Sequence, residues 1–384
     1  MIGRIQKTIY LDNAATSYPK PPEVYREMSN AMRRYGGNPG RGSHALSSAA
    51  ADALFDCRTA AAEMFSCEAD DVALTFNATH ALNIAIKGLM GNGGNIMISD
   101  IEHNSVLRPV SSLCKNNGCT LTVYPTHGGK SDMILNSIED LICPDTRLIV
   151  ACHMSNVCGI RLPVEEIGAL CRQRRIAYVV DASQSAGHIP INARAIGADA
   201  ICMPGHKGLM GPQGTGLLIT GGERLPEALL DGGSGVNSLD PEMPDFSPER
   251  YEAGTLPAFS AAVLARGIRW VKKVGIKTIC DDETRLKLRL LHEISGIDRV
   301  KLYGDSGIGG TLLFNIDGVT PSEVGNTLNR AGICVRTGLH CSPLAHRTLG
   351  TGENGAIRVS VGYFNKESDI VKLRNEVARI AQTT

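Results

Sequence analysis

The segment AICMPGHKGLMGPQGTG, residues 200–216, joins a short apolar run to a turn with His206 and Lys207 and then to a glycine-rich return. The apolar run predicts a buried strand, and the glycines predict a tight connection into a second strand. A lysine is usually a solvated surface residue. Between two buried strands, however, Lys207 is expected to point towards the end of a sheet. A lowered pKa there would suit it to form a Schiff base.

The same alternation extends upstream of this segment. Short apolar runs predict further strands, and helix-patterned segments such as Pro163–Arg174 separate them. Strands buried on both faces and separated by helices predict an α/β fold with a mostly parallel sheet. The predicted strands are Val72–Phe76, Asn95–Ser99, Thr120–Tyr124, Leu148–His153, Ala177–Val180, Ala200–Met203 and Gly216–Ile219.

The pattern changes after Ile219. A loop rich in Gly, Pro, Asp and Ser covers residues 221–257, and a long helical pattern begins near Ala258. Strand-like segments (Thr311–Ile316, Ala356–Val361) and a final helix (Lys366–Ala381) predict a smaller α+β domain. Because 384 residues exceed one ordinary core, we predict a large α/β domain over 17–257 and a small domain formed by 1–16 and 258–384.

The composition restricts the partners. Lys plus Arg and Asp plus Glu both number 39, so the net charge is zero and no nucleic-acid or membrane partner is expected. Met1–Tyr10 lacks the apolar core of a secretory signal, and no stretch approaches the roughly 20 apolar residues that span a bilayer. These features predict a cytoplasmic protein. The 12 cysteines are scattered and form no C-x-x-C pair, which predicts mostly buried free thiols and no metal site.

Polar residues with chemical potential follow several predicted strands. In open parallel sheets ligands bind beyond the carboxyl ends of the strands, so residues placed there are expected to form one composite site. Loops are generally polar, and this alone explains one or two such residues. It explains the larger number found here less well. They are Thr79, His80, His103, Asn156, Asp181, His206 and Lys207.

Asp181 comes directly after an apolar strand. A buried carboxylate costs free energy unless it is paired. Pyridoxal 5′-phosphate (PLP) enzymes place such an anion opposite the pyridine nitrogen, which keeps the ring protonated. A helix N-cap is the alternative reading of Asp181. Together with Lys207, the cofactor role is favoured.

Two more residues have equally specific alternatives. Thr79 lies at a strand–helix junction, where free N–H groups and its hydroxyl form a phosphate cradle; ordinary N-capping by Thr79 is the alternative. His103 follows another strand, where an imidazole can stack on an aromatic cofactor. The alternative for His103 is a structural loop histidine.

Several motifs occur together over almost the whole chain and resemble the class V aminotransferase-fold family of PLP enzymes (fold type I). The resemblance implies a PLP-dependent transferase fold with a mostly parallel large domain and a smaller α+β domain. The motifs are IYLDNAAT (9–16), GRGSHALS (40–47), Glu102–His103, MSNVCG (154–159), DASQ (181–184), GHK (205–207), GPQGTG (211–216) and YEAGT (251–255).

The resemblance implies a role for each matching position. Lys207 corresponds to the Schiff-base lysine, Asp181 to the partner of the pyridine nitrogen and His103 to the ring-stacking histidine. Gln184 corresponds to the donor to the phenolic oxygen. The remaining positions correspond to phosphate binders (Thr79, the backbone of His80, His206), to the threonine that reaches the phosphate of the other subunit (Thr255) and to an asparagine near the substrate carboxylate (Asn156). The role of Thr255 implies a homodimer.

The segment VRTGLHCSPL, residues 335–344, resembles the catalytic-cysteine segment of cysteine desulfurases. These enzymes remove sulfur from L-cysteine as a persulfide and leave alanine, so Cys341 is the implied nucleophile. A lone cysteine is normally inert and buried, but a Gly/Ser/Pro loop beside His340 favours an exposed thiol. Downstream, Arg358 resembles the arginine that binds the substrate carboxylate bidentately.

The short spacing between Cys341 and Arg358 resembles the second group of desulfurases, which includes enzymes that also act on selenocysteine. A short loop carries persulfide less freely, which favours a dedicated acceptor protein. His103 is a further candidate for proton transfer. Positions at which this chain departs from the family pattern are Ala78, His80, Pro204 and Leu339. Ser183 or backbone groups could replace the phosphate contact that Pro204 removes.

Three alternatives stay open at the level of sequence. One is a selenocysteine lyase. Another is a transaminase or lyase of the same fold in which Cys341 is incidental. The third is a sulfur-carrier or scaffold protein without catalysis, against which the presence of both Lys207 and Asp181 argues.

Overall fold

A seven-stranded sheet forms the centre of the larger part of the molecule. The structure is a computed structural model that describes residues 8–40, 42–304 and 307–382. The strand order is β2-β8-β7-β6-β5-β3-β4, and all neighbours are parallel except β8, which is antiparallel to both β2 and β7. The strands are β2 (Val72–Thr75), β3 (Asn95–Ser99), β4 (Thr120–Tyr124), β5 (Thr146–Cys152), β6 (Ala177–Asp181), β7 (Ala200–Pro204) and β8 (Gly216–Thr220).

These strands confirm the predicted α/β fold with a mostly parallel sheet. Every predicted strand is present within two residues of its expected ends. The inner strands are buried on both faces, as their unbroken apolar runs require, whereas most residues of the edge strand β4 are exposed. β5 starts two residues before the predicted Leu148 because Thr146 pairs with Asn95 across a register shift.

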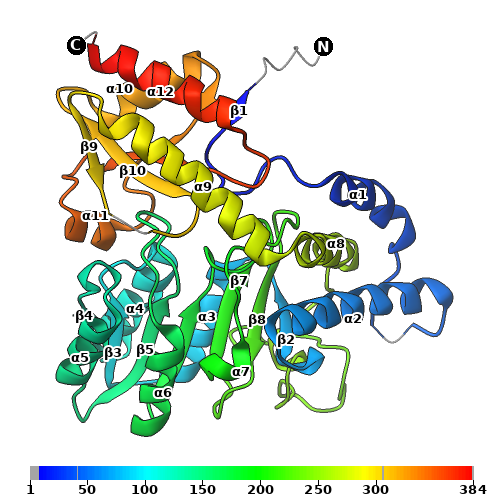
Figure 1. The fold of residues 1–384 in the computed structure, drawn as a ribbon. Coiled ribbons are helices and arrows are strands. Elements are labelled where there is room, and N and C mark those ends of the chain that lie inside the picture. The colour runs from blue at the N-terminus through cyan, green and yellow to red at the C-terminus, as the bar shows by residue number, and fades with distance from the viewer. Residues whose placement is uncertain (1–7, 41, 305–306, 383–384) are drawn as a thin grey trace.

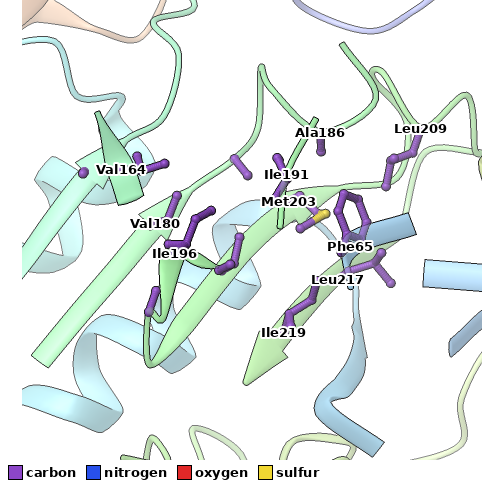
Figure 2. Packing of buried hydrophobic residues seen from close by; sticks show 14 of the residues in the cluster. Phe65, Val164, Val180, Ala186, Ile191, Ile196, Met203, Leu209, Leu217 and Ile219 are labelled. Carbon is purple, nitrogen blue, oxygen red and sulfur yellow. The ribbon is translucent and has the colours of Figure 1, made fainter. Parts of the chain in front are cut away.

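Helices cover both faces of the sheet (Figure 1). On one face, α3 and α4 pack Leu82, Ile86 and Val110 against the strands. On the other face, Phe65 of α2 and Val164 of α6 join strand residues in a second core. Figure 2 shows this packing around Met203, Leu217 and Ile219. The helices in this part are α1 (Pro22–Arg34), α2 (Ala45–Phe65), α3 (Ala78–Met90), α4 (Asn104–Asn116), α5 (Ser131–Leu141), α6 (Val164–Arg174) and α7 (Ala193–Ile196).

A smaller α+β part follows in the C-terminal third. Its antiparallel sheet has the order β12-β13-β10-β9, and a parallel pair joins β1 to β11. A separate core of Leu286, Leu290, Phe314, Val359 and Leu373 holds the helices at 276–295 and 367–382 against this sheet. The strands are β1 (Ile9–Tyr10), β9 (Val300–Tyr303), β10 (Thr311–Ile316), β11 (Ile333–Cys334), β12 (Arg336–Gly338) and β13 (Ala356–Ser360); the helices are α8 (Ala258–Val274), α9 (Ile276–Ser295), α10 (Pro321–Arg330), α11 (Pro343–Leu349) and α12 (Glu367–Gln382).

Helix α8 lies at the junction of the two parts. It begins where the sequence predicts, yet Leu264 and Ile268 pack in the same core as Phe65 of α2. We propose that the two domains divide at residue 257. Parts of the predicted small domain, residues 1–7, 305–306 and 383–384, lie outside the described residues.

The fold brings polar residues together at one edge of the large sheet. β3, β5, β6 and β7 are parallel neighbours, so their carboxyl ends meet at this edge. His103, Asn156, Asp181 and Lys207 lie at or just after these ends. Within the described ranges, no helix is both long and apolar enough to cross a membrane. Each of the 12 cysteines is a free thiol, and Cys143 and Cys341 are the exposed ones.

Candidate functional site

A cavity of about 210 Å³ opens at the carboxyl edge of the sheet. The structure brings most of the predicted site residues into its wall. Residues that the sequence analysis did not select, including Arg336 and Ser105, also line it. The predicted residues in the wall are Thr79, His103, Asn156, Asp181, Gln184, His206, Lys207 and Arg358.

The turn that carries Lys207 is held by its backbone. The His206 carbonyl accepts hydrogen bonds from Lys20 Nζ (2.6 Å) and Thr16 Oγ1 (3.1 Å), and Ser17 Oγ donates to the Lys207 carbonyl (2.7 Å). Gly208 is required here, because a Cβ at this position would lie 2.2 Å from the Ala186 carbonyl oxygen. The N-terminal segment therefore fixes the position from which the Lys207 side chain enters the cavity.

The Lys207 amine is tuned towards its neutral form. Burial lowers its pKa to about 8, and the charges of Arg358 and Arg336 act in the same direction, whereas Asp181 opposes them. A fraction of the amine is therefore neutral near physiological pH, as nucleophilic attack on a carbonyl group requires.

Asp181 is the last residue of β6 and is almost fully buried. Its Oδ1 accepts a hydrogen bond from the Ser183 backbone N (2.9 Å). No α-helix starts here, since the next helix, α7, begins at Ala193 with Asn192 as its N-cap. The helix N-cap alternative for Asp181 is therefore wrong, and its carboxylate belongs to the cavity wall.

His103 has the structural role that was its alternative reading, and it also lines the cavity, so its stacking on a cofactor stays a prediction. It is the N-cap of α4, and its Nδ1 accepts from the Ser105 backbone N (3.0 Å). The ring proton of the neutral imidazole therefore lies on Nε2. Burial lowers the His103 pKa to about 4, so the ring is neutral at physiological pH. The Ser105 hydroxyl bridges His103 Nδ1 (2.8 Å) and Thr79 Oγ1 (2.9 Å).

Thr79 does not cap α3, although N-capping was the alternative role for this residue. Asn77 is the N-cap, with its side chain accepting from the His80 backbone N (2.9 Å), so N-capping by Thr79 is wrong. Thr79 and Ala78 line the cavity, and their N–H groups belong to the first helical turn, which no intrahelical carbonyl reaches. The His80 ring stacks on Phe76 (centroids 4.8 Å apart) in the wall of a different cavity.

Other predicted cofactor residues lie around the same cavity. Gln184 Nε2 donates to the Ala14 carbonyl (2.9 Å). His206 Nδ1 contacts Thr16 Oγ1 (3.0 Å), and burial lowers the His206 pKa to about 4. Pro204 and Ser183, which bear on the missing phosphate contact, are both in the wall.

Arg358 lies on β13 and is buried beside the cavity, with 1% of its surface exposed. One terminal nitrogen donates to Asp12 Oδ1 (2.6 Å) and the other to the Asn156 backbone carbonyl (3.0 Å). Its Nε is buried without a hydrogen-bond partner among the described residues. Burial lowers the pKa of the guanidinium, and Asp12 opposes this. The arginine therefore keeps N–H groups with which to bind an anion.

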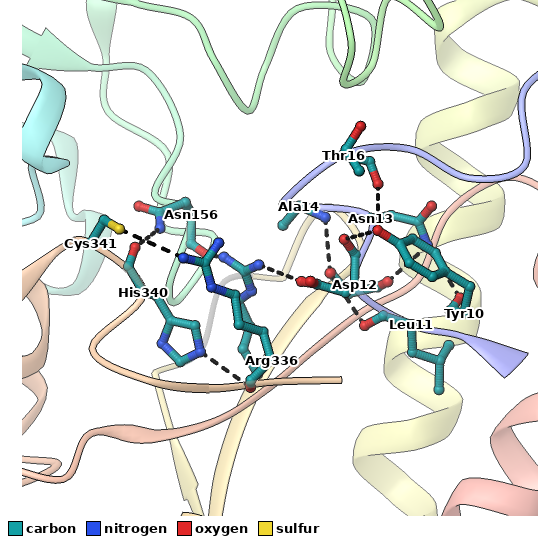
Figure 3. Close-up of polar contacts among 12 residues, drawn as sticks. Tyr10, Leu11, Asp12, Asn13, Ala14, Thr16, Asn156, Arg336, His340 and Cys341 are labelled. Atoms are coloured by element: carbon teal, nitrogen blue, oxygen red, sulfur yellow. Dashed lines mark hydrogen bonds and ion pairs between the residues drawn. The ribbon is translucent and has the colours of Figure 1, made fainter. Parts of the chain in front are cut away.

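Cys341 is exposed and lies between the buried residues His340 and Ser342, of which His340 lines the cavity. The Asn104 backbone N donates to its carbonyl (2.7 Å), and Asn156 Nδ2 donates to the carbonyl of His340 (2.9 Å). Arg336 NH2 lies 3.6 Å from the Cys341 sulfur (Figure 3). Cys341 is outside the set of residues that line the cavity, although its neighbour His340 is within it.

Thr255 does not lie in the Lys207 cavity. It lines a separate cavity of about 690 Å³, together with Arg58 and Glu252, which form a buried ion pair. A role for Thr255 at the site within the same chain is therefore not seen, and its predicted role towards a second subunit stays a prediction.

The sequence analysis missed residues that support the predicted ones. Asp12 pairs with Arg358, Arg336 contacts Cys341, and Ser105 connects Thr79 to His103. Asp12 and Arg336 are inside the motifs IYLDNAAT and VRTGLHCSPL, so the motifs contained a signal for them. Ser105 carried no such signal, because only the fold brings α3 and α4 together.

The donor set of this cavity fits PLP. The Lys207 amine has a lowered pKa, and the buried Asp181 carboxylate supplies an anion for a pyridine nitrogen. The backbone N–H groups of Ala78 and Thr79, in the first turn of α3, provide donors for a phosphate group. His103 presents a neutral imidazole beside them. Among the described residues, no cluster of three or more His, Cys, Asp or Glu side chains has the arrangement of a metal site.

Comparisons with known proteins agree with this site. The family model for class-V aminotransferases matches residues 9–373. A probable cysteine desulfurase of Methanothermobacter thermautotrophicus is 35% identical, over 99% of this chain and 96% of that protein. A probable cysteine desulfurase of Pyrococcus abyssi is 33% identical, over 95% and 92%.

Solved structures give the same result. The apo structure of a cysteine desulfurase from Thermococcus onnurineus NA1 has a TM-score of 0.91 at 30% identity and covers 98% of this chain and 96% of that one. A cysteine desulfurase from Escherichia coli has the same fold, with a TM-score of 0.87 at 23% identity and coverage of 98% and 95%. The chain therefore belongs to the class-V aminotransferase family of PLP-dependent enzymes, among the cysteine desulfurases.

Proposed function

We propose that this enzyme takes the sulfur of L-cysteine onto Cys341 as a persulfide and releases L-alanine. The observation that carries the proposal is the docking of an exposed cysteine at the rim of the cavity that contains Lys207. The Cys341 turn is bonded there to Asn104 and Asn156. The relatives named above support the same chemistry through their names.

Arg358 and Asn156 bind the substrate carboxylate in this proposal. The buried guanidinium is oriented by Asp12, which leaves Nε and further N–H groups for a carboxylate. Asn156 uses one N–H of its amide for the His340 carbonyl, so the second remains for the substrate. This arrangement orients an amino acid with its side chain towards the Cys341 turn.

Lys207 moves the α-proton of the substrate. A neutral amine is needed to accept a proton, and a pKa of about 8 makes that form available near neutral pH. When bound, PLP supplies an electron sink for the charge left on the α-carbon. Asp181 keeps the pyridine nitrogen protonated, and Gln184, Thr79 and His206 hold the other polar groups of the cofactor. The His80 backbone N–H, which was also predicted to bind the phosphate, is already bonded to the Asn77 side chain.

Cys341 then accepts the sulfur atom. The Cys341 thiolate attacks the substrate sulfur, a new S–S bond forms, and the Cβ–S bond of the substrate breaks. The electron pair of that bond remains on the substrate carbon, which is protonated to give the methyl group of alanine. Arg336 lies 3.6 Å from the sulfur and donates a hydrogen bond to it. His103, neutral and protonated on Nε2, is placed to transfer protons in this exchange.

The wider setting follows from the same features. We infer a cytoplasmic homodimer in which Thr255 reaches the phosphate of the other subunit. The Cys341 turn is short and bonded on both sides, which favours handing the persulfide to a dedicated acceptor protein that docks beside it.

The test is product analysis with the PLP-loaded enzyme. With L-cysteine and a reductant, sulfide and alanine are expected in equal amounts, and Cys341→Ser is expected to abolish both while keeping the visible absorbance of the bound cofactor. Cys143→Ser is the matched control, because Cys143 is the other exposed cysteine. Equal turnover by Cys341→Ser would refute the role of Cys341, and pyruvate with ammonia would indicate a lyase. Selenocysteine, compared at equal concentration, tests the substrate preference.

A further inference from the structure

The turn that presents Cys341 has a backbone conformation that L residues rarely adopt. The Ser342 backbone N donates to the Leu339 carbonyl (2.9 Å), which closes a β-turn over residues 339–342. Its two central residues, His340 and Cys341, have φ angles of 52° and 57°. Two successive left-handed residues are typical of type I′ turns, where Asn and Gly are strongly preferred. Neither residue is glycine, so other contacts must hold the turn.

Residues that follow the strands of the large sheet hold one side of the Cys341 turn. The Asn156 amide bonds both residues that flank Cys341: Nδ2 donates to the His340 carbonyl (2.9 Å), and Oδ1 accepts from Ser342 Oγ (2.7 Å). The Asn104 backbone N, at the start of α4, donates to the Cys341 carbonyl (2.7 Å). These bonds fix the position of the turn, but they do not determine the orientation of the His340 side chain.

A chain of hydrogen bonds fixes the His340 side chain from the other side. His340 Nε2 contacts the Arg336 carbonyl (3.3 Å), His340 Nδ1 contacts His346 Nε2 (3.0 Å), and His346 Nδ1 contacts Thr351 Oγ1 (2.7 Å). The two rings lie nearly parallel, with centroids 5.1 Å apart. Figure 3 shows the His340 ring turned back towards Arg336, away from the Cys341 sulfur.

Each donor and acceptor in this series of hydrogen bonds can be assigned. A carbonyl only accepts, so His340 Nε2 carries the proton and Nδ1 of the neutral ring accepts from His346 Nε2. His346 Nδ1 then accepts from the Thr351 hydroxyl. Both rings are almost fully buried, and burial lowers the pKa of His340 to about 3 and that of His346 to about 4. The neutral forms that the chain requires are therefore present throughout the physiological pH range.

We propose that His346 is a positioning residue for the Cys341 nucleophile, acting through His340 to hold the Cys341 turn in its left-handed conformation, with Thr351 fixing the orientation of His346. The inference rests on the proposed function of Cys341. His346 lies in α11 and contacts the turn through the His340 ring. Its role is therefore to set the position of the sulfur acceptor, and it has no part in proton removal at Lys207.

The experiment compares two reactions of the PLP-loaded enzyme in matched variants. His346→Gln keeps an N–H donor near the Nε2 position, whereas His346→Leu fills the space without a donor. The first reaction is persulfide formation on Cys341 in a single turnover with L-cysteine, followed by mass spectrometry. The second is exchange of the α-proton of L-alanine in D₂O, which needs Lys207 and no cysteine side chain.

His346→Leu is expected to slow persulfide formation roughly 10- to 100-fold, because displacement of a reacting atom by about 1 Å has effects of that order. It should leave α-proton exchange unchanged, and His346→Gln should restore most of the rate. Amide hydrogen exchange at residues 339–342 should become faster in His346→Leu. If His346→Leu does not fold, Thr351→Val replaces it as the test variant. Thr351→Val is expected to have a smaller effect in the same direction. Thr327→Val on the exposed face of α10 is its control.

Two results would overturn the inference. One is wild-type persulfide formation in both His346→Leu and Thr351→Val. The other is an equal loss of both reactions without rescue by glutamine, which indicates a general packing role. Either is distinct from a failure of the proposed function, which would appear as persulfide-independent turnover in Cys341→Ser.

Discussion

The Lys207 turn and the Cys341 turn both present a reactive side chain to one cavity, but they are held in different ways. The Lys207 turn contains glycines, and its carbonyl groups are bonded by Thr16, Ser17 and Lys20. The Cys341 turn has two non-glycine residues at left-handed φ, and side chains such as Asn156 hold it in place. One turn adopts its conformation easily, whereas the other requires a set of directed contacts.

This difference matches the two tasks. A group that moves a proton within the cavity works best when its backbone is fixed. Under the proposed function the Cys341 sulfur has to meet the substrate at one defined position, so its turn must also be held in place. The Asn156 side chain does this through hydrogen bonds to the buried residues His340 and Ser342, in place of a backbone clamp.

The largest expected effect separates the two turns by chemistry. Lys207→Ala should reduce α-proton exchange of L-alanine by roughly 10²–10⁴-fold, because general acid–base groups contribute that much. The visible absorbance of the bound cofactor should also be lost. Cys341→Ser should retain both, as measured by NMR in D₂O and by spectrophotometry. Retention of exchange in Lys207→Ala would mean that another base acts in the cavity.

A smaller effect is expected at Arg358, which bonds Asp12 and the Asn156 carbonyl beside the cavity. Asp12→Asn keeps an oxygen acceptor for Arg358 but removes the negative charge opposite a buried guanidinium. The free energy of unfolding should fall by roughly 1–3 kcal/mol, the usual range for hydrogen bonds to charged groups. Thermal unfolding measures it, with Asp132→Asn on the exposed start of α5 as the control. Equal stability of both variants would show that the Asp12–Arg358 pair adds nothing to the fold.

The Lys207 turn should also give a pH dependence in the cofactor-free protein. The Lys207 pKa is lowered from 10.5 to about 8 in the folded state, so between these values the unfolded chain binds the proton and the folded chain does not. The contribution of Lys207 to stability should therefore rise with pH in this window, by at most about 1.4 kcal/mol per pH unit. Buried thiols with a raised pKa, such as Cys57 and Cys171, act in the opposite direction above their ordinary value of 9.0, so the Lys207 contribution is read as the difference between the wild type and Lys207→Met. Lys20 has the same shift and adds to the slope.

Denaturant unfolding between pH 8 and 10.5 measures this slope, and Lys207→Met should reduce it. An unchanged slope in Lys207→Met would assign the whole dependence to other groups, Lys20 first, which the variant Lys20→Met then tests.

The smallest expected effect concerns the backbone clamp itself. Ser17→Ala removes the donor to the Lys207 carbonyl and should lower the free energy of unfolding by about 1 kcal/mol. Ser111→Ala, where an exposed hydroxyl bonds within α4, is the matched control. Calorimetry should show a lower melting temperature for Ser17→Ala alone. A shift as large in Ser111→Ala would indicate that loss of a hydroxyl, rather than of the clamp, is responsible.

Much of the fold follows from local patterns. Continuous apolar runs predict β3, β6 and β7 almost to the residue, because strands buried on both faces need such runs. The carboxyl ends of parallel strands share one edge, so the proximity of Asp181 and Lys207 also follows from the sequence.

What the sequence does not predict depends on contacts between distant segments. Asn77, rather than Thr79, caps α3, and both are acceptable caps on sequence grounds. The His80 ring stacks on Phe76 and lines a different cavity from Lys207. The contacts between Asp12 and Arg358, and between Asn156 and the Cys341 turn, join residues far apart in the sequence, where no periodic pattern applies.

The pairing of Asp12 with Arg358 has a consequence for the order in which the protein matures. The two residues are 346 positions apart, and residues 13 and 14 likewise bond Ser360. During synthesis residues 12–14 are made long before their partner strand β13, so these contacts form late. A nascent chain can form its central sheet first, but Arg358 gains its Asp12 partner only after the chain through β13 has been made.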